Sequence, residues 1–128
     1  MAHRFQKHYT REEARALLPE LRTRLQRLNA LRRLVGIQDR QLTSLLATGD
    51  DLGGQLVNDS IRSLAEMRHL LLDFHTRQIQ IKDIERGLVD FPALIGGREV
   101  FLCWEMDEED IEYWHELDSG YAGRERLT

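Results

Sequence analysis

Apolar residues in the first third of the chain recur every three or four positions, which is the spacing of an amphipathic helix. The series comprises Ala14, Leu17, Leu18, Leu21, Leu25, Leu28, Leu31, Val35, Leu42, Leu45 and Leu46. Thr10 and Glu13 have the spacing of a capping box, so we expect the helix to begin there. Pro19 lies within the pattern and has no N–H to donate, so we expect a kink or a restart near residues 16–19.

A second amphipathic pattern follows the turn signal TGDDLGG at residues 48–54 and predicts a helix over residues 56–76. Two helices joined by a short Gly-rich loop form an antiparallel hairpin, which we assign to residues 10–76. Polar residues interrupt the two apolar stripes at Asp39 and Arg68. Folding the hairpin about Asp51 predicts an ion pair between them, either within the hairpin or across a dimer.

After residue 76 the apolar residues recur every second position, which is typical of strands. We expect three short strands at residues 78–82, 88–91 and 98–104, the second of them ended by Pro92. On the third strand Val100, Leu102 and Trp104 share one face. Apolar residues also occur on its other face, so this strand should be covered on both sides. Residues 108–115 carry acidic residues at their start, which favours a short helix there.

These elements define one α+β domain over residues 1–128. It consists of a long antiparallel helical hairpin (10–76), followed by a small antiparallel three-stranded sheet and a short acidic C-terminal helix with a tail (78–128). A chain of 128 residues can bury one modest core. No apolar run approaches the ~20 residues needed to cross a bilayer, and the first ten residues lack the apolar region of a secretory signal. We therefore expect a cytoplasmic protein without a membrane partner.

The net charge of −4 hides an asymmetry along the chain. Residues 1–86 contain 15 basic and 11 acidic residues, whereas residues 87–128 contain 3 and 11. The simpler interpretation is that a basic helical part packs near an acidic part of the same domain. The alternative is a basic face for a phosphate-bearing partner. No aromatic residue lies among the arginines of the first helix, so we do not expect nucleic acid as a partner.

Several short motifs in the chain resemble a known family. They are TREEA at residues 10–14, LLPEL at 17–21, KD at 82–83, GLVDFPA at 87–93, LCW at 102–104, WH at 114–115 and GYAGR at 120–124. In order and spacing they resemble the prokaryotic "domain of unknown function 2203", over nearly the whole chain. The resemblance implies no established activity, so no catalytic role is carried over from it.

Cys103 and His115 are the best candidates for metal ligands, because zinc and iron accept sulfur and imidazole donors. Asp90, Glu105, Glu108 and Glu112 lie near them in sequence. The chain has no Cys-x2-Cys pair and no His-Glu-x2-His motif. The alternative is that Cys103 is a small buried hydrophobe and that His115 is a hydrogen-bonded structural residue.

The same residues could also serve as a nucleophilic dyad, with Asp90 orienting His115 and the Gly96–Gly97 turn as an oxyanion site. More generally, the residues that favour binding surfaces gather near the end of the chain. We expect one concave surface formed by Asp90, Trp104, Trp114, His115 and Arg124.

The leading hypothesis is a non-enzymatic protein that acts as a homo-oligomer, most simply a dimer, because the first helix is too long to be covered by the second. The hypothesis requires no cofactor. The alternative is a zinc- or iron-binding protein, or a metal-dependent enzyme, that uses Cys103 and His115. The sequence identifies no small-molecule ligand.

Overall fold

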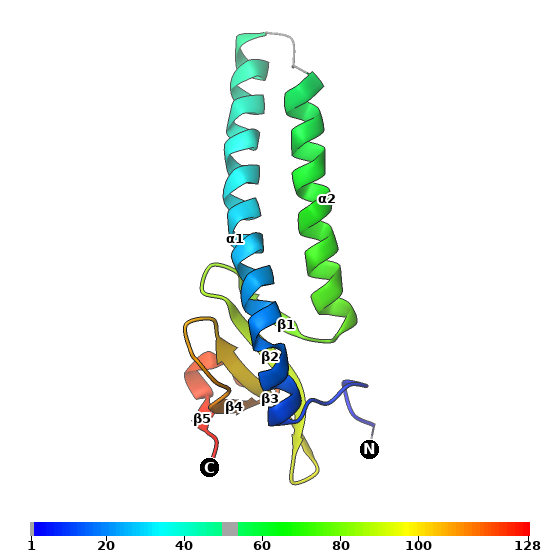
Figure 1. Ribbon diagram of the computed structural model, residues 1–128, viewed down its shortest axis with the longest axis vertical. Coiled ribbons are helices and arrows are strands. Elements are labelled where there is room, and N and C mark those ends of the chain that lie inside the picture. The colour runs from blue at the N-terminus through cyan, green and yellow to red at the C-terminus, as the bar shows by residue number, and fades with distance from the viewer. Residues whose placement is uncertain (1, 50–53) are drawn as a thin grey trace.

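The computed structural model describes residues 2–49 and 54–128, so the turn expected about Asp51 lies outside the described residues. The elements are α1 (Arg11–Thr48), α2 (Gly54–Thr76), β1 (Gln80–Asp83), β2 (Leu88–Ile95), β3 (Arg98–Glu105), β4 (Tyr113–Glu116), the 3-10 helix η1 (Tyr121–Gly123) and β5 (Glu125–Arg126). The two helices run side by side, and the sheet packs on the N-terminal half of α1 (Figure 1). The α+β fold with a helical hairpin is therefore confirmed. In the described part of the chain, neither helix is long and apolar enough to cross a membrane.

Helix α1 begins where the capping box predicts. The Thr10 hydroxyl accepts a hydrogen bond from the Glu13 N–H at 3.0 Å, and the Glu13 carboxylate accepts one from the Thr10 N–H at 3.0 Å. The helix continues through Pro19 without a break, so the expected restart is wrong. A proline inside a helix costs about 3 kcal/mol. Burial of Leu18 and Leu21 on either side of it offsets that cost.

Contacts between the helices reveal the register of the hairpin. Arg24 lies 3.1 Å from Asp73, and Gln38 lines the same hollow as residue 59 of α2. This register leaves Arg68 more than two helical turns from the level of Asp39. Within the chain, the predicted pair of Asp39 and Arg68 is therefore wrong, because the helices face each other in a different register from the one that folding about Asp51 assumes.

The strands form one antiparallel meander whose spatial order, β1-β2-β3-β4-β5, is the order of the chain. The three predicted strands are β1, β2 and β3, while β4 and β5 are additional. Strand β2 continues through Pro92 instead of ending there. The β1–β2 ladder ends at Asp90, so the ring of Pro92 lies on an edge where the missing N–H leaves no acceptor unsatisfied. The carbonyl of Pro92 accepts the N–H of Tyr9 at 2.7 Å.

Residues 108–115 do not form the expected acidic helix. Residues 108–112 form a loop, and residues 113–115 belong to β4. Arg15 lies 2.8 Å from Asp110, and Arg22 donates to the carbonyl of Glu108 at 3.1 Å. The acidic segment thus lies against the arginines of α1, and contacts within the domain hold it in place without a helix. Arg11 and Arg15 of the basic part thus pair with Asp110 of the acidic part.

The two faces of the sheet have different neighbours. Toward α1 the sheet presents Val89, Phe91, Ala93, Val100, Leu102 and Trp104, which form the core together with the leucines of α1. The opposite face, here called the distal face, carries Asp90, Phe101, Cys103 and His115. All four are buried. Strand β3 lies in the middle of the sheet and is covered on both faces, as its sequence predicts.

The N-terminal segment, residues 2–10, is tied to the edge of the distal face. The Glu99 carboxylate accepts the backbone N–H groups of Arg4 at 2.7 Å and Phe5 at 3.0 Å. The side-chain carbonyl of Gln78 accepts the next two backbone N–H groups. The Phe5 ring meets that of Phe101 edge-on, with ring centres 5.3 Å apart. This segment therefore covers one end of the distal face.

Candidate functional site

The register of the sheet gathers three polar side chains on the distal face. Asp90 on β2 is directly opposite Cys103 on β3, and His115 on β4 is opposite Phe101, one diagonal step from Cys103. Direct and diagonal neighbours on one face are within reach of each other. One ligand atom from each of Asp90, Cys103 and His115 lies within 4.8 Å of the other two. None of the three residues is more than 2 % exposed.

Hydrogen bonds at both ring nitrogens hold His115 in one orientation. Nδ1 lies 2.7 Å from the carbonyl oxygen of Glu116, which can only accept, so Nδ1 carries a hydrogen. Nε2 lies 3.0 Å from Oδ2 of Asp90. In the neutral imidazole, the lone pair of Nε2 is then directed at the carboxyl group, and a proton on either group would complete a hydrogen bond between Asp90 and His115. A metal ion can take the place of such a proton.

Burial makes the charged forms of the other two groups costly. It raises the pKa of Asp90, and the interaction with the neighbouring His115 ring opposes this shift. Burial, together with the neighbouring Asp90, raises the pKa of the Cys103 thiol to about 12. Oδ1 of Asp90 is buried and has no hydrogen-bond partner among the described residues. The Cys103 thiol can interact with this carboxyl group when no metal is present, and a cation would satisfy the same acceptor.

A cavity of about 200 Å³ lies against these residues. It is lined by Lys82, Leu88, Asp90, Phe101, Cys103, His115, Leu117, Ser119, Gly120 and Tyr121. The sheet supplies the floor, and the segment that follows β4 supplies much of the rim. The three polar groups are thus buried within the sheet and still border a space large enough for a small molecule.

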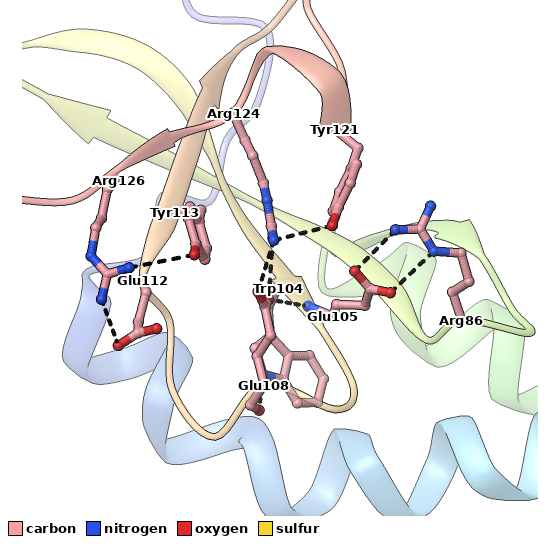
Figure 2. Close-up of polar contacts among 9 residues, drawn as sticks. All are labelled: Arg86, Trp104, Glu105, Glu108, Glu112, Tyr113, Tyr121, Arg124 and Arg126. Carbon is pink, nitrogen blue, oxygen red and sulfur yellow. Dashed lines mark hydrogen bonds and ion pairs between the residues drawn. The ribbon is translucent and has the colours of Figure 1, made fainter.

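Arginine and tyrosine side chains alternate beside this rim. The guanidinium carbon of Arg124 lies 3.8 Å from the ring centre of Tyr113 and 4.2 Å from that of Tyr121, and Arg86 lies 4.4 Å from the ring centre of Tyr121. The arginines also pair with acids, namely Arg86 with Glu105, Arg124 with Glu108 and Arg126 with Glu112 (Figure 2). We call Arg86, Tyr121, Arg124 and Tyr113 the Arg–Tyr ladder. It fixes Tyr121 at the edge of the cavity.

The sheet divides the five residues predicted to form one surface. Asp90 and His115 lie together on the distal face, and the charge of Arg124 acts on Cys103 between them. The two tryptophans lie elsewhere. Their alternation along β3 and β4 places them toward α1.

Each tryptophan has a role in packing. Trp104 is fully buried, and its Nε1–H donates to the carbonyl of Glu108 at 2.8 Å. Trp114 packs against the core and lies beneath Arg98, whose guanidinium carbon is 5.7 Å from the ring centre. Both residues therefore support the sheet from the side opposite the cavity.

The proposed nucleophilic dyad has little geometric support. The high pKa of the Cys103 thiol disfavours a thiolate, and Nε2 of His115 is directed at Asp90. The Gly96–Gly97 turn closes the far end of the β2–β3 hairpin, beyond the Ile95–Arg98 pair. It is too far along the ladder to stabilise an oxyanion at Cys103.

The sequence reasoning overlooked two features. Lys82 and Tyr121 line the cavity, and only the register of the sheet could have placed them there. A second cluster, His3, His8 and Glu99, has ligand atoms within 4.8 Å of one another. Nε2 of His8 lies 2.7 Å from Oε2 of Glu99. In the sequence, only the two histidines, five positions apart, could have indicated this cluster.

The chain is an α+β protein in which a helical hairpin supports a five-stranded meander that carries a buried Asp–Cys–His cluster. Residues 7–127 match the model of the family described as "Uncharacterized conserved protein (DUF2203)". The chain belongs to this family, which confirms the resemblance seen in its motifs. No curated protein and no solved structure matches the chain.

Proposed function

We propose that the chain binds a divalent transition-metal ion, zinc in the first instance, through Asp90, Cys103 and His115. The observation that carries the proposal is the convergence of oxygen, sulfur and nitrogen donors in one buried cluster. Tetrahedral zinc places its donor atoms about 3.3–3.8 Å apart, which this cluster reaches with small movements. Iron(II) is the alternative ion for the same donors.

Two further details support a metal ion at this cluster. Histidines that bind metals commonly donate their other ring N–H to a carbonyl or carboxylate, and the Nδ1–H of His115 donates to the Glu116 carbonyl. Oδ1 of Asp90 lacks a partner among the described residues. A bound cation would neutralise the carboxylate and the thiolate, whose burial is otherwise costly. Three protein ligands beside a cavity are typical of sites that leave one position open to another molecule.

The metal proposal is tested by titrating chelator-treated protein with Zn²⁺ and Co²⁺. We expect one equivalent to bind at the cluster, a higher thermal unfolding midpoint, and a thiolate-to-cobalt absorption band. Cys103→Ser should abolish the band, and Asp90→Asn should weaken binding at least about 100-fold. The control is the double variant His3→Asn and His8→Asn, which removes the second cluster and should bind as before. Equal binding by Cys103→Ser and the unchanged protein would overturn the proposal.

Self-association is a second candidate function, and one observation favours it. Helix α2 has an apolar stripe beside the face that packs on α1, formed by the exposed Leu64, Leu71 and Leu72 and the half-buried Met67. Leu64, Met67 and Leu71 are spaced by three and four positions, as on a surface that packs on another helix. The occupant that we propose is the hairpin of a second copy, in a two-fold dimer of a cytoplasmic protein.

Light scattering and sedimentation across micromolar to millimolar concentrations test the dimer. We expect a mass of about twice 15.0 kDa, and Leu64→Glu with Leu71→Glu should reduce it to that of one chain. The matched control is Arg62→Glu, which also introduces an acid on α2 but at a side chain that is 78 % exposed and outside the apolar stripe. This variant should leave the dimer intact. A monomer at every concentration would remove this candidate.

A further inference from the structure

Lys82 is the cationic side chain at the mouth of the cavity. It lies on β1, one position from residues that pair with β2, and lines the cavity beside Asp90. Its ammonium nitrogen is 5.6 Å from the ring centre of Phe101. Lys82 has no ion pair with an acid of the described chain, although its charge acts on Asp90. A lysine that is held over a cavity without an acidic partner attracts an anion.

The charges at the metal-loaded site determine which anion is favoured. A divalent ion is balanced by the carboxylate of Asp90 and the thiolate of Cys103. Lys82 then leaves the site with one net positive charge, which complements a ligand with one negative charge. A carboxylate carries one charge at neutral pH, whereas phosphate carries between one and two. The charge balance therefore favours a monocarboxylate.

The walls of the cavity indicate what is attached to the carboxylate. Leu88, Phe101 and Leu117 are apolar, and Tyr121 closes the rim. The volume of about 200 Å³ is below the ~300–1,000 Å³ of cavities that hold larger organic ligands. The cavity therefore suits a short hydrocarbon chain and excludes a nucleotide or a long acyl chain.

We infer that the cavity binds a short-chain monocarboxylate, with its carboxylate between the metal ion and Lys82 and its hydrocarbon part against Leu88, Phe101 and Leu117. This inference rests on the metal site proposed above and adds the class of ligand. Lys82 is the residue that selects for an anion. Tyr121, which the Arg–Tyr ladder holds at the rim, limits the length of the chain.

The test uses the cobalt-loaded protein and follows its absorption spectrum during additions of acetate, butyrate and inorganic phosphate. We expect both carboxylates to change the spectrum saturably, butyrate to bind more tightly than acetate because of its apolar contacts, and phosphate to bind more weakly than either. Lys82→Met keeps the apolar stem over Phe101 and should weaken carboxylate binding about tenfold or more. If that variant does not fold, Lys82→Gln takes its place.

The matched control is Lys7→Met, because Lys7 also lies over an aromatic ring but does not line the cavity. It should bind carboxylates as the unchanged chain does, and Lys82→Arg should retain most of the affinity. If cobalt binds but carboxylates leave the spectrum unchanged, or bind Lys82→Met equally well, the inference is wrong and the metal site stands. Tighter binding of phosphate also overturns it. Failure to bind cobalt overturns both proposals together.

Discussion

Asn29, in the middle of α1, donates its side-chain amide to the backbone carbonyl of Ile84 at 2.7 Å. The same nitrogen lies 3.3 Å from the carbonyl of Leu25 in the preceding turn of the helix. Asn29 is buried, and Ile84 belongs to the turn between β1 and β2. One amide therefore connects the helical hairpin to the sheet at a point where α1 is otherwise lined with leucines.

Replacing Asn29 with Ala should lower the free energy of unfolding by about 1–3 kcal/mol, because the Ile84 carbonyl then loses its partner inside the protein. Urea denaturation at equilibrium measures the change. Asn58→Ala, at an exposed position of α2, is the matched control and should change stability by less than about 0.5 kcal/mol. Equal effects of the two substitutions would contradict the role given to Asn29.

Gly87 and Gly96 allow the cost of a steric clash to be separated from the cost of backbone strain. Both have positive φ, 65° and 58°. A Cβ on Gly87 would collide with the side chain of Met106, whereas a Cβ on Gly96 would meet no atom. Gly96→Ala should therefore lower the free energy of unfolding by about 1–2 kcal/mol. Gly87→Ala should lower it by clearly more. Thermal unfolding of the two variants measures the difference. A similar loss in both variants would mean that Met106 moves aside easily.

Arg124 should be the most important member of the Arg–Tyr ladder for stability. Its guanidinium and the Glu108 carboxylate are 14 % and 17 % exposed, so Arg124→Ala leaves a mostly buried charge without its partner. We expect a loss of about 2–3 kcal/mol and faster hydrogen exchange at the Leu127 N–H, which bonds to the Glu112 carbonyl.

Arg126 provides the comparison for this prediction. It belongs to the same segment, but its side chain is 67 % exposed, and surface ion pairs contribute little. Arg126→Ala should cost less than about 1 kcal/mol. If the two substitutions are equally harmful, the contacts of the C-terminal segment as a whole matter more than the buried pair.

The N-terminal segment should depend on the ionisation of Glu99. Burial raises the pKa of Glu99, but the bonds from His8 and from the Phe5 and Arg4 N–H groups outweigh it and lower the pKa from 4.5 to about 2. Because the folded pKa is below the unfolded one, the stabilisation is complete above about pH 4.5 and is lost as the pH falls to about 2. The amide resonances of Arg4 and Phe5 should titrate in this range and should not do so in Glu99→Gln.

Local signals predicted the helices well. The capping box at Thr10 and the leucine spacing of α1 reflect contacts within a few residues, and the structure retains them. The strand at Tyr113–Glu116 was missed because the acids before it resemble a helix start. Arg15 and Arg22 of α1 hold those acids in a loop instead. Contacts between residues so far apart in the chain cannot be predicted from the local sequence. The continuation of β2 through Pro92 was missed for the same reason, because it depends on the position of Pro92 at an edge of the sheet.

The sequence predicted only part of the candidate site, because the rest depends on contacts between distant residues. Cys103 and His115 were recognised by residue type, and the structure brings them together. Their association with Asp90 depends on the register of three strands, which alternation within one strand does not determine. The same alternation predicted that Trp104 lies on the opposite face from Cys103. The clustering of aromatic residues in the sequence nevertheless suggested a single surface, which the sheet divides.

The order of the strands has a consequence for how the protein is made. Each strand pairs with the one before it, so every strand that leaves the ribosome finds its neighbour already synthesised, and the meander can grow from β1 to β5 during translation. The N-terminal segment is the exception. The N–H of Arg4 bonds to Glu99, 95 residues later in the chain. Residues made early in translation must therefore stay unattached until most of the chain exists.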